Sequence, residues 1–268
     1  MLRYWKIYNP ARSFFFASMA TVMLFIVGRN IPPQMVAATF FSVFFMFFGL
    51  HALNWLFDID LMVPEKKGRR VARRKLAIAA IIPMAASFLI IANFLPLLPF
   101  VVLLGNVLAI FVYGHMQHKY PVISIVKAYL AASAILFATA VAGINRLFIV
   151  PALMVMLLAF VHNLLKGISF GLAPKYVHYT FANLYGPRVV GIMAAGAILV
   201  LLIVSLFPVA YYPRMYLYIM GIADIFFAYV AYRMIIDPKK YAPESKWFLI
   251  AGGVFAAAAF AIPTYFVL

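Results

Sequence analysis

Long apolar runs follow one another along the whole chain, separated by short polar breaks, and this pattern limits the folds open to it. A helix that crosses a bilayer needs about 20 mostly apolar residues. Only 10% of the residues are charged, whereas a soluble domain carries roughly 25%. We therefore predict an integral membrane protein whose fold class is all-α, with nine transmembrane helices in a single polytopic domain over residues 1–268. The predicted spans are 13–28, 34–57, 75–94, 97–114, 121–142, 147–168, 189–209, 214–235 and 247–266.

The ends of these spans are set by residues that favour turns or interrupt helices. Pro187 precedes the seventh predicted span, and the pair Asp237–Pro238 follows the eighth.

Residues 1–13 are polar and basic, so the first apolar run is predicted to be a retained span rather than a cleaved signal. The chain has no cysteine, which excludes disulfide bonds, thiolate metal sites and cysteine nucleophiles.

The distribution of positive charge predicts the orientation of the helices. The chain carries 22 lysines and arginines and a net charge of +16. If the N-terminus lies inside, all these cations except Arg29, Arg146 and Arg214 fall on the inner side. The positive-inside rule then places the N-terminus in the cytoplasm and the C-terminus outside, in the plasma membrane. Because the cations lie in loops between spans, we interpret them as topology determinants that contact anionic lipid headgroups or diphosphates, not nucleic acid.

The segment 51–75 combines several features suited to chemistry. It passes from an apolar helix through Asn54, Asp58 and Asp60 into a loop whose basic residues include Arg70. The chain has six acidic residues, and half of them lie within residues 58–65. Ionisable residues in membrane helices are rare and mark functional sites. All five histidines and five of the six acids fall on the predicted cytoplasmic side, so we expect binding or catalysis there.

Several short segments have the same order and spacing as the motifs of a known family. They are Asn54 and Asp58 at the end of the second span, Tyr113 and Lys119 to Pro121 around the end of the fourth, Thr180 to Gly186 before the seventh, Ile222 to Asp224 on the eighth, and Asp237–Pro238 directly after it. With these segments the chain resembles the UbiA superfamily of intramembrane prenyltransferases over nearly its whole length. Within that superfamily it looks most like the archaeal branch that geranylgeranylates glycerol phosphates.

The resemblance implies a bundle with two Asp-rich motifs, on the second and sixth spans, that face each other across a central cavity. Their carboxylates hold Mg²⁺, which bridges to the diphosphate of an allylic prenyl donor. Hard cations held by oxygen ligands are suited to neutralising the departing pyrophosphate, and basic side chains strengthen the clamp. Carried over to this chain, the catalytic candidates are Asn54 and Asp58, and the Mg²⁺ candidates are Asn54, Asp58 and Asp60. The diphosphate-binding candidates are Lys119, Arg70 and Lys166.

The sequence departs from the family at both acidic motifs. In the first motif the family pattern places acids at positions 55, 58 and 62, and here Trp55 and Met62 occupy two of them. Asp60 is displaced by two residues, which is about 200° of rotation on a continuing helix, so it meets Asp58 only if the helix ends between them. The second motif is degenerate, because Ser169 and Ala173 stand where aspartates are expected.

Three functions therefore remain open, and the third, a carrier of a cofactor bound by histidines, ranks behind the other two. The first is a divergent prenyltransferase that binds a prenyl diphosphate and transfers its prenyl group to a lipid or aromatic acceptor. The second is a catalytically silent relative, a subunit of a larger membrane complex, that holds an isoprenoid lipid or quinone. In the first two cases the expected partners are membrane lipids and an isoprenoid ligand, joined by other membrane subunits in the second case.

The remaining polar residues have structural interpretations beside the functional ones. His51 and His162 occupy equivalent turns of the second and sixth spans, but no ligand spacing around them favours haem or another metal. Lys166 is interpreted either as a direct phosphate ligand or as an interfacial lysine whose apolar stem lies along the helix. We expect Asp224, near the middle of the eighth span, to form a hydrogen bond with a neighbouring helix rather than to relay protons.

Overall fold

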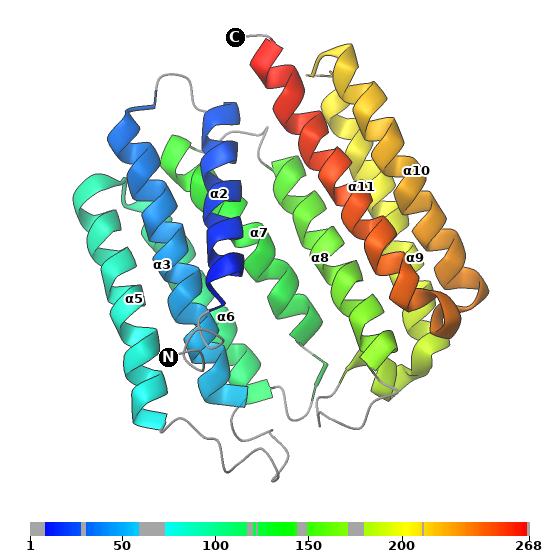
Figure 1. Cartoon of the computed structure of the whole chain (residues 1–268), viewed down its shortest axis with the longest axis horizontal. Helices are drawn as coiled ribbons and strands as arrows, with labels where there is room; N and C mark the ends of the chain where they lie inside the picture. Colours follow the sequence, from blue (N-terminus) through cyan, green and yellow to red (C-terminus); the bar gives the residue numbers. More distant parts are fainter. Residues whose placement is uncertain are drawn as a thin grey trace. The chain divides into compact units, whose positions relative to one another are not determined.

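The computed structural model describes residues 9–27, 31–58, 73–116, 120–121, 123–143, 149–170, 180–210 and 212–266. Within these ranges the chain forms α-helices with one 3₁₀ turn, and no strand is present (Figure 1). The helices are α2 (Pro10–Val27), α3 (Pro33–Asp58), α5 (Arg73–Phe94), α6 (Leu98–Met116), α7 (Ile123–Ala142), α8 (Ile149–Phe170), α9 (Phe181–Leu206), α10 (Arg214–Ile236) and α11 (Pro238–Phe266).

The described helices fit a membrane protein. Eight of them, from α3 to α11, are long and apolar enough to cross a bilayer, while Pro10–Ile26 of α2 is a shorter apolar helix. The prediction of an all-α membrane protein is therefore confirmed. The ninth span and the sidedness of the termini stay predictions.

The packing divides the described helices into two units. Unit 1 contains α2, α3, α5, α6 and the part of α7 from Ser133 onward, and unit 2 contains the earlier part of α7 with α8, α9, α10 and α11. The prediction of a single domain is not tested by this division, and each unit is described by itself.

In unit 1, α3 packs against α2, α5 and α6. Gly49 allows α5 to come close, because a Cβ there would lie 2.8 Å from the carbonyl oxygen of Ala80. Ser87 of α5 donates a hydrogen bond to the carbonyl of Ser42 at 2.9 Å, and this bond supplies a partner for a hydroxyl that lies in an apolar layer. Phe16 of α2 stacks on Phe47 with ring centroids 4.3 Å apart.

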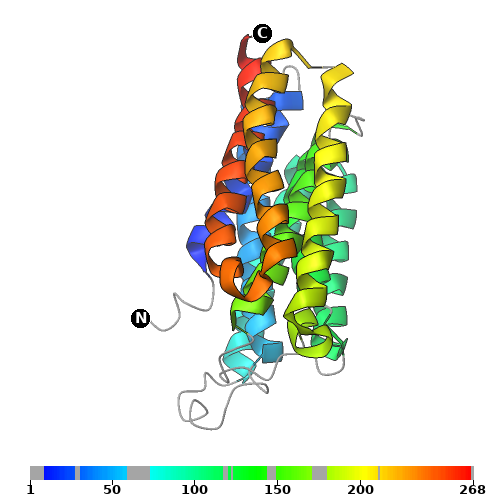
Figure 2. The ribbon, with the colours of Figure 1, turned by 90° about the vertical axis from the view of Figure 1, so that its right-hand side faces the viewer.

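In unit 2, α10 and α11 run side by side in both views (Figures 1 and 2). A core of buried apolar residues joins them to α8 and α9. Small residues bring the helices close, as expected where apolar lipid provides little driving force for helix association. A Cβ on Gly252 of α11, for example, would lie 2.5 Å from the ring of Phe227 on α10.

Two predicted spans begin too late, and in both cases the reason is a proline. Asp237 caps α11, since its Oδ1 accepts a hydrogen bond from the backbone N–H of Lys240 at 3.2 Å. Pro238 follows as the first helical residue, a position that proline favours. The helix therefore starts at 238 instead of 247. Similarly, α9 starts at Phe181 and not at 189, and continues across a kink at Gly186, whose φ of 80° glycine adopts readily.

Candidate functional site

The end of unit 1 at which α3 and α6 stop and α5 begins carries the first predicted motif. Asn54 lies on the last turn but one of α3 and is half-buried. The following turn is fixed by Phe57, whose ring lies so close to Gly114 of α6 that a Cβ there would be 2.5 Å from it. Phe57 also makes an edge contact with Phe111, at 5.6 Å between centroids. Asn54 is thus presented by a packed helix end rather than by a loop.

Asp58 is the last residue of α3 and follows Asn54 by four residues, just over one helical turn. The side chain of Asp58, together with Asp60, Arg70 and Lys119, lies outside the described residues. Over the described ranges no group of three or more His, Asp or Glu residues could hold a metal ion. Mg²⁺ usually binds one or two carboxylates and completes its shell with phosphate oxygens and water. One amide and one carboxylate a turn apart fit that kind of shared site.

In unit 2, the end at which α8 and α10 stop and α9 and α11 begin carries Lys166. This lysine is half-buried on α8. Ser169, which stands at an expected aspartate position, donates its hydroxyl to the carbonyl of Leu165 on the same helix at 2.8 Å. The hydroxyl of Ser169 is therefore engaged in a hydrogen bond to the backbone of its own helix. Lys246 of α11 is also half-buried and lies close enough to Lys166 for their positive charges to repel each other.

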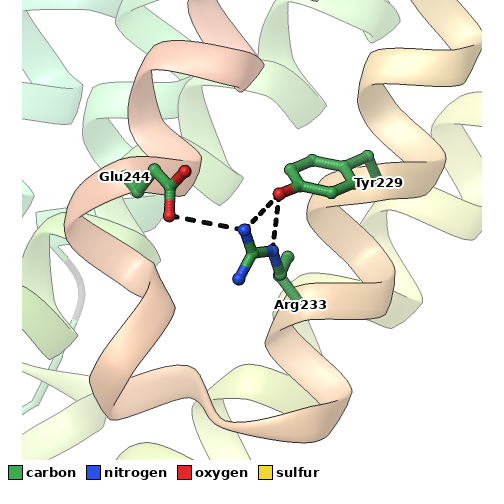
Figure 3. A network of polar contacts seen from close by, with 3 residues as sticks. All are labelled: Tyr229, Arg233 and Glu244. Atoms are coloured by element: carbon green, nitrogen blue, oxygen red, sulfur yellow. Dashed lines mark hydrogen bonds and ion pairs between the residues drawn. The ribbon is translucent and has the colours of Figure 1, made fainter.

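A third cation at this end, Arg233 of α10, holds two helices together (Figure 3). Its guanidinium donates to the hydroxyl of Tyr229, with Nε at 2.7 Å, and approaches Oε2 of Glu244 on α11 at 3.5 Å. It also lies over the ring of Tyr241, 3.9 Å from the centroid. These contacts join α10 to α11 across the turn at Asp237. The sequence analysis assigned Arg233 only to topology and missed this role.

Asp224 of α10 forms the hydrogen bond that the sequence analysis expected. Ser205 of α9 donates its hydroxyl to Oδ2 of Asp224 at 3.0 Å, and Tyr216 donates to the carbonyl of Ser205 at 2.8 Å. The other carboxylate oxygen, Oδ1, is buried without a hydrogen-bond partner among the described residues. The structural interpretation of Asp224 as a link between α9 and α10 is confirmed.

One apolar groove lies away from these polar residues. It has a volume of about 380 Å³ and lies in unit 1, where α2 ends and α3 begins, at the opposite end of α3 from Asn54. Its lining is almost entirely apolar and includes Phe25, Val36 and Phe40. A groove of this composition is suited to the acyl chains of surrounding lipid, and the hydroxyl of Thr21 in its lining donates a hydrogen bond to the carbonyl of Ala17 on its own helix.

No protein-family model matches the chain, and no curated protein matches its sequence. Solved structures do match. A digeranylgeranylglyceryl phosphate synthase superposes with a TM-score of 0.80 at 20% identity, over 97% of both chains. The chain has the UbiA fold. An apo UbiA homologue from Aeropyrum pernix K1 matches with a TM-score of 0.72 at 13% identity, over 94% of this chain and 98% of the other. A UbiA homologue from Archaeoglobus fulgidus bound to DMAPP and Mg²⁺ matches with a TM-score of 0.64 at 18% identity, over 98% of both chains.

These matches confirm the resemblance that the sequence motifs indicated, at the level of the fold. Because the spans align over nearly the full length of both chains, the order of the elements around Asn54 and Lys166 is that of the UbiA fold. The functional assignment of each site residue stays a prediction.

Proposed function

We propose that this chain is a divergent intramembrane prenyltransferase, which binds a prenyl diphosphate at the basic ends of its helices and transfers the prenyl group to a lipid or aromatic acceptor. The observation that carries the proposal is the match in fold over 97% of both chains to a digeranylgeranylglyceryl phosphate synthase. The half-buried Asn54 on the last turns of α3 adds support, because it begins the only acidic motif that the chain retains.

In this reaction the C–O bond between the allylic carbon and the diphosphate breaks, and the electron pair leaves with pyrophosphate. A nucleophilic atom of the acceptor forms the new bond to the allylic carbon and loses its proton. Negative charge grows on the leaving group, so Lys166, Lys119 and Arg70 are proposed to bind the diphosphate oxygens. Walls formed by membrane helices exclude water, which would otherwise capture the allylic carbon.

Mg²⁺ is the cofactor that the donor residues fit. Asn54 and Asp58 would hold it, with Asp60 as a further candidate ligand, and the bound ion would neutralise charge on the diphosphate. An Archaeoglobus fulgidus UbiA homologue binds DMAPP together with Mg²⁺, which supports this assignment by analogy of fold alone.

The proposal also includes the orientation, with the N-terminus and the basic helix ends in the cytoplasm and the C-terminus outside the plasma membrane. The absence of cysteine makes this easy to test. A single cysteine at Lys239, exposed at the start of α11, should react with a membrane-impermeant maleimide only in inverted vesicles, and one at Arg214 only in right-side-out vesicles. The reverse pattern would refute the orientation.

The lack of acidic side chains on α8 favours a second candidate function. The serine at an expected aspartate position bonds to its own helix, and the sequence has no carboxylate between Glu65 and Asp224. If one acidic motif is insufficient for catalysis, the chain would hold an isoprenoid lipid or quinone as a silent subunit of a larger membrane complex.

One assay separates these two functions. The purified chain in lipid nanodiscs is incubated with labelled geranylgeranyl diphosphate, Mg²⁺ and either a glycerol phosphate lipid or a hydroxylated aromatic acid as acceptor. We expect a prenylated product whose formation falls at least about 100-fold in Asp58→Asn and Asn54→Ala. Glu244→Gln, an exposed carboxylate on α11, is the matched control and should keep full activity.

Absence of product with every acceptor would refute the transferase proposal. In that case retention of a quinone or isoprenoid lipid through purification, together with other membrane subunits, would support the silent function.

A further inference from the structure

Asp224 places a carboxyl group near the middle of a helix that is long and apolar enough to cross a membrane. That helix, α10, runs from Arg214 to Ile236. At 1.5 Å per residue, Asp224 lies about 15 Å from the first residue and about 18 Å from the last. The cations of α10 are Arg214 and Arg233, so each lies at least about 13 Å from Asp224 along the helix axis. A charge at this depth is costly unless a partner compensates it.

The elements that pack against α10 bring no cation to this level within their described residues. They are α9, the 3₁₀ turn that follows it, and α11. The charged residue of α9 is Arg188, near the end of that helix that lies away from Asp224. The charged residues of α11 end at Lys246, six residues before Gly252, which meets the ring of Phe227 on α10. Because α10 and α11 run in opposite directions, Lys246 lies beyond Phe227 and away from Asp224 (Figure 1).

The hydroxyl of Ser205 has one proton and two acceptors within hydrogen-bonding distance. Its Oγ lies 2.7 Å from the carbonyl oxygen of Leu202 on its own helix and 3.0 Å from Oδ2 of Asp224. With an ionised Asp224, only one of these contacts is a hydrogen bond at any moment, because both partners are acceptors. With a proton on Oδ2, the carboxyl O–H donates to Oγ of Ser205, and Ser205 donates to Leu202. Tyr216, against whose ring Tyr212 packs, instead donates to the carbonyl of Ser205.

The other carboxyl oxygen distinguishes the two states. Oδ1 of Asp224 is buried and has no hydrogen-bond partner among the described residues. In a carboxylate this oxygen would carry part of a negative charge, whereas in a carboxylic acid it is a neutral carbonyl, which is less costly to bury. We infer that Asp224 is a proton-binding site, a neutral carboxylic acid whose Oδ2 proton is donated to Oγ of Ser205. The proton completes the link between α9 and α10, and the inference is independent of prenyl transfer.

Infrared spectroscopy tests this inference, because a protonated carboxyl has a C=O stretching band that a carboxylate lacks. The full chain is measured at neutral pH in a maltoside detergent, which contains no carbonyl group. We expect such a band in the wild type, and we expect it to shift when the aspartate carboxyl carbons are labelled with ¹³C. Asp224→Asn keeps the shape of the side chain and an N–H donor for Ser205, and should abolish the band. Glu244→Gln, which removes an exposed carboxyl of α11, is the matched control and should leave it unchanged.

Ser205→Ala adds a readout that a merely structural role of Asp224 would not change. Removing the acceptor of the carboxyl proton should shift the band to higher wavenumber without abolishing it. Absence of a ¹³C-sensitive band in the wild type would overturn the inference, and this result requires no variant to fold. A band that persists in Asp224→Asn would belong to another aspartate and would overturn it as well. If Asp224→Asn does not fold, the Ser205→Ala spectrum decides, and an unshifted band there contradicts the assigned hydrogen bond.

Discussion

A close helix contact in unit 2 gives a quantitative prediction about Gly191 of α9. A Cβ at this position would lie 2.6 Å from the carbonyl oxygen of Met234, and 2.8 Å from Cβ and 2.9 Å from Cγ of Pro238. These atoms belong to backbone and a proline ring at the junction of α10 and α11, so they cannot rotate away. Gly191→Ala would therefore force α9 to withdraw from the junction. The displacement is about 0.8 Å, the difference between 2.6 Å and the 3.4 Å lower limit of ordinary contact.

Two opposing terms set the magnitude. Overpacking a well-packed site costs about 1–3 kcal/mol, whereas replacing glycine by alanine within a helix gains about 1 kcal/mol. The net loss expected for Gly191→Ala is about 1–2 kcal/mol. Gly196 of the same helix is the matched control, because it is exposed and no described atom outside its own helix turn lies within 4 Å of its Cβ position. Gly196→Ala carries only the favourable term and should be neutral or stabilising.

The measurement is the thermal transition of each variant in detergent, followed by loss of the monodisperse peak in size-exclusion chromatography. For a chain of this size each kcal/mol corresponds to about 2–4 °C. We expect Gly191→Ala to melt several degrees below the wild type and Gly196→Ala at or slightly above it. If the two variants have the same transition temperature, the close contact at the α10–α11 junction does not exist in the protein.

Four further substitutions test three polar contacts in the same unit by the same assay. Ser205→Ala removes the hydrogen bond to the buried carboxyl of Asp224 and should cost about 1–3 kcal/mol; an unchanged transition would exclude this bond. Asp237→Ala removes the N-cap of α11 and should cost about 1 kcal/mol, and equal stability would show that Pro238 alone defines the helix start. Arg233→Gln should lower the transition more than Glu244→Gln, because the guanidinium also contacts two tyrosine rings while an exposed ion pair contributes little; the opposite order would contradict the geometry in Figure 3.

The existence of the membrane helices could be predicted from the sequence because long apolar runs are a strong and local signal. The starts of two helices could not be predicted, because proline can either interrupt a helix or occupy its first turn. Pro238 was interpreted as a break, yet with Asp237 before it the same residue begins α11 at once. Pro187 follows Gly186, and the positive φ of that glycine lets α9 bend and continue. In both cases the neighbouring residue decides whether proline ends a helix or opens one.

Only the part of the candidate site that belongs to the first acidic motif could be predicted from the sequence. Asn54 was expected at the end of a membrane helix and lies there. Lys246 was missed, because its relation to Lys166 depends on how α11 packs against α8 and no local pattern records it. Arg233 was missed for a similar reason, since two of its partners, Tyr241 and Glu244, lie beyond the turn that joins α10 to α11.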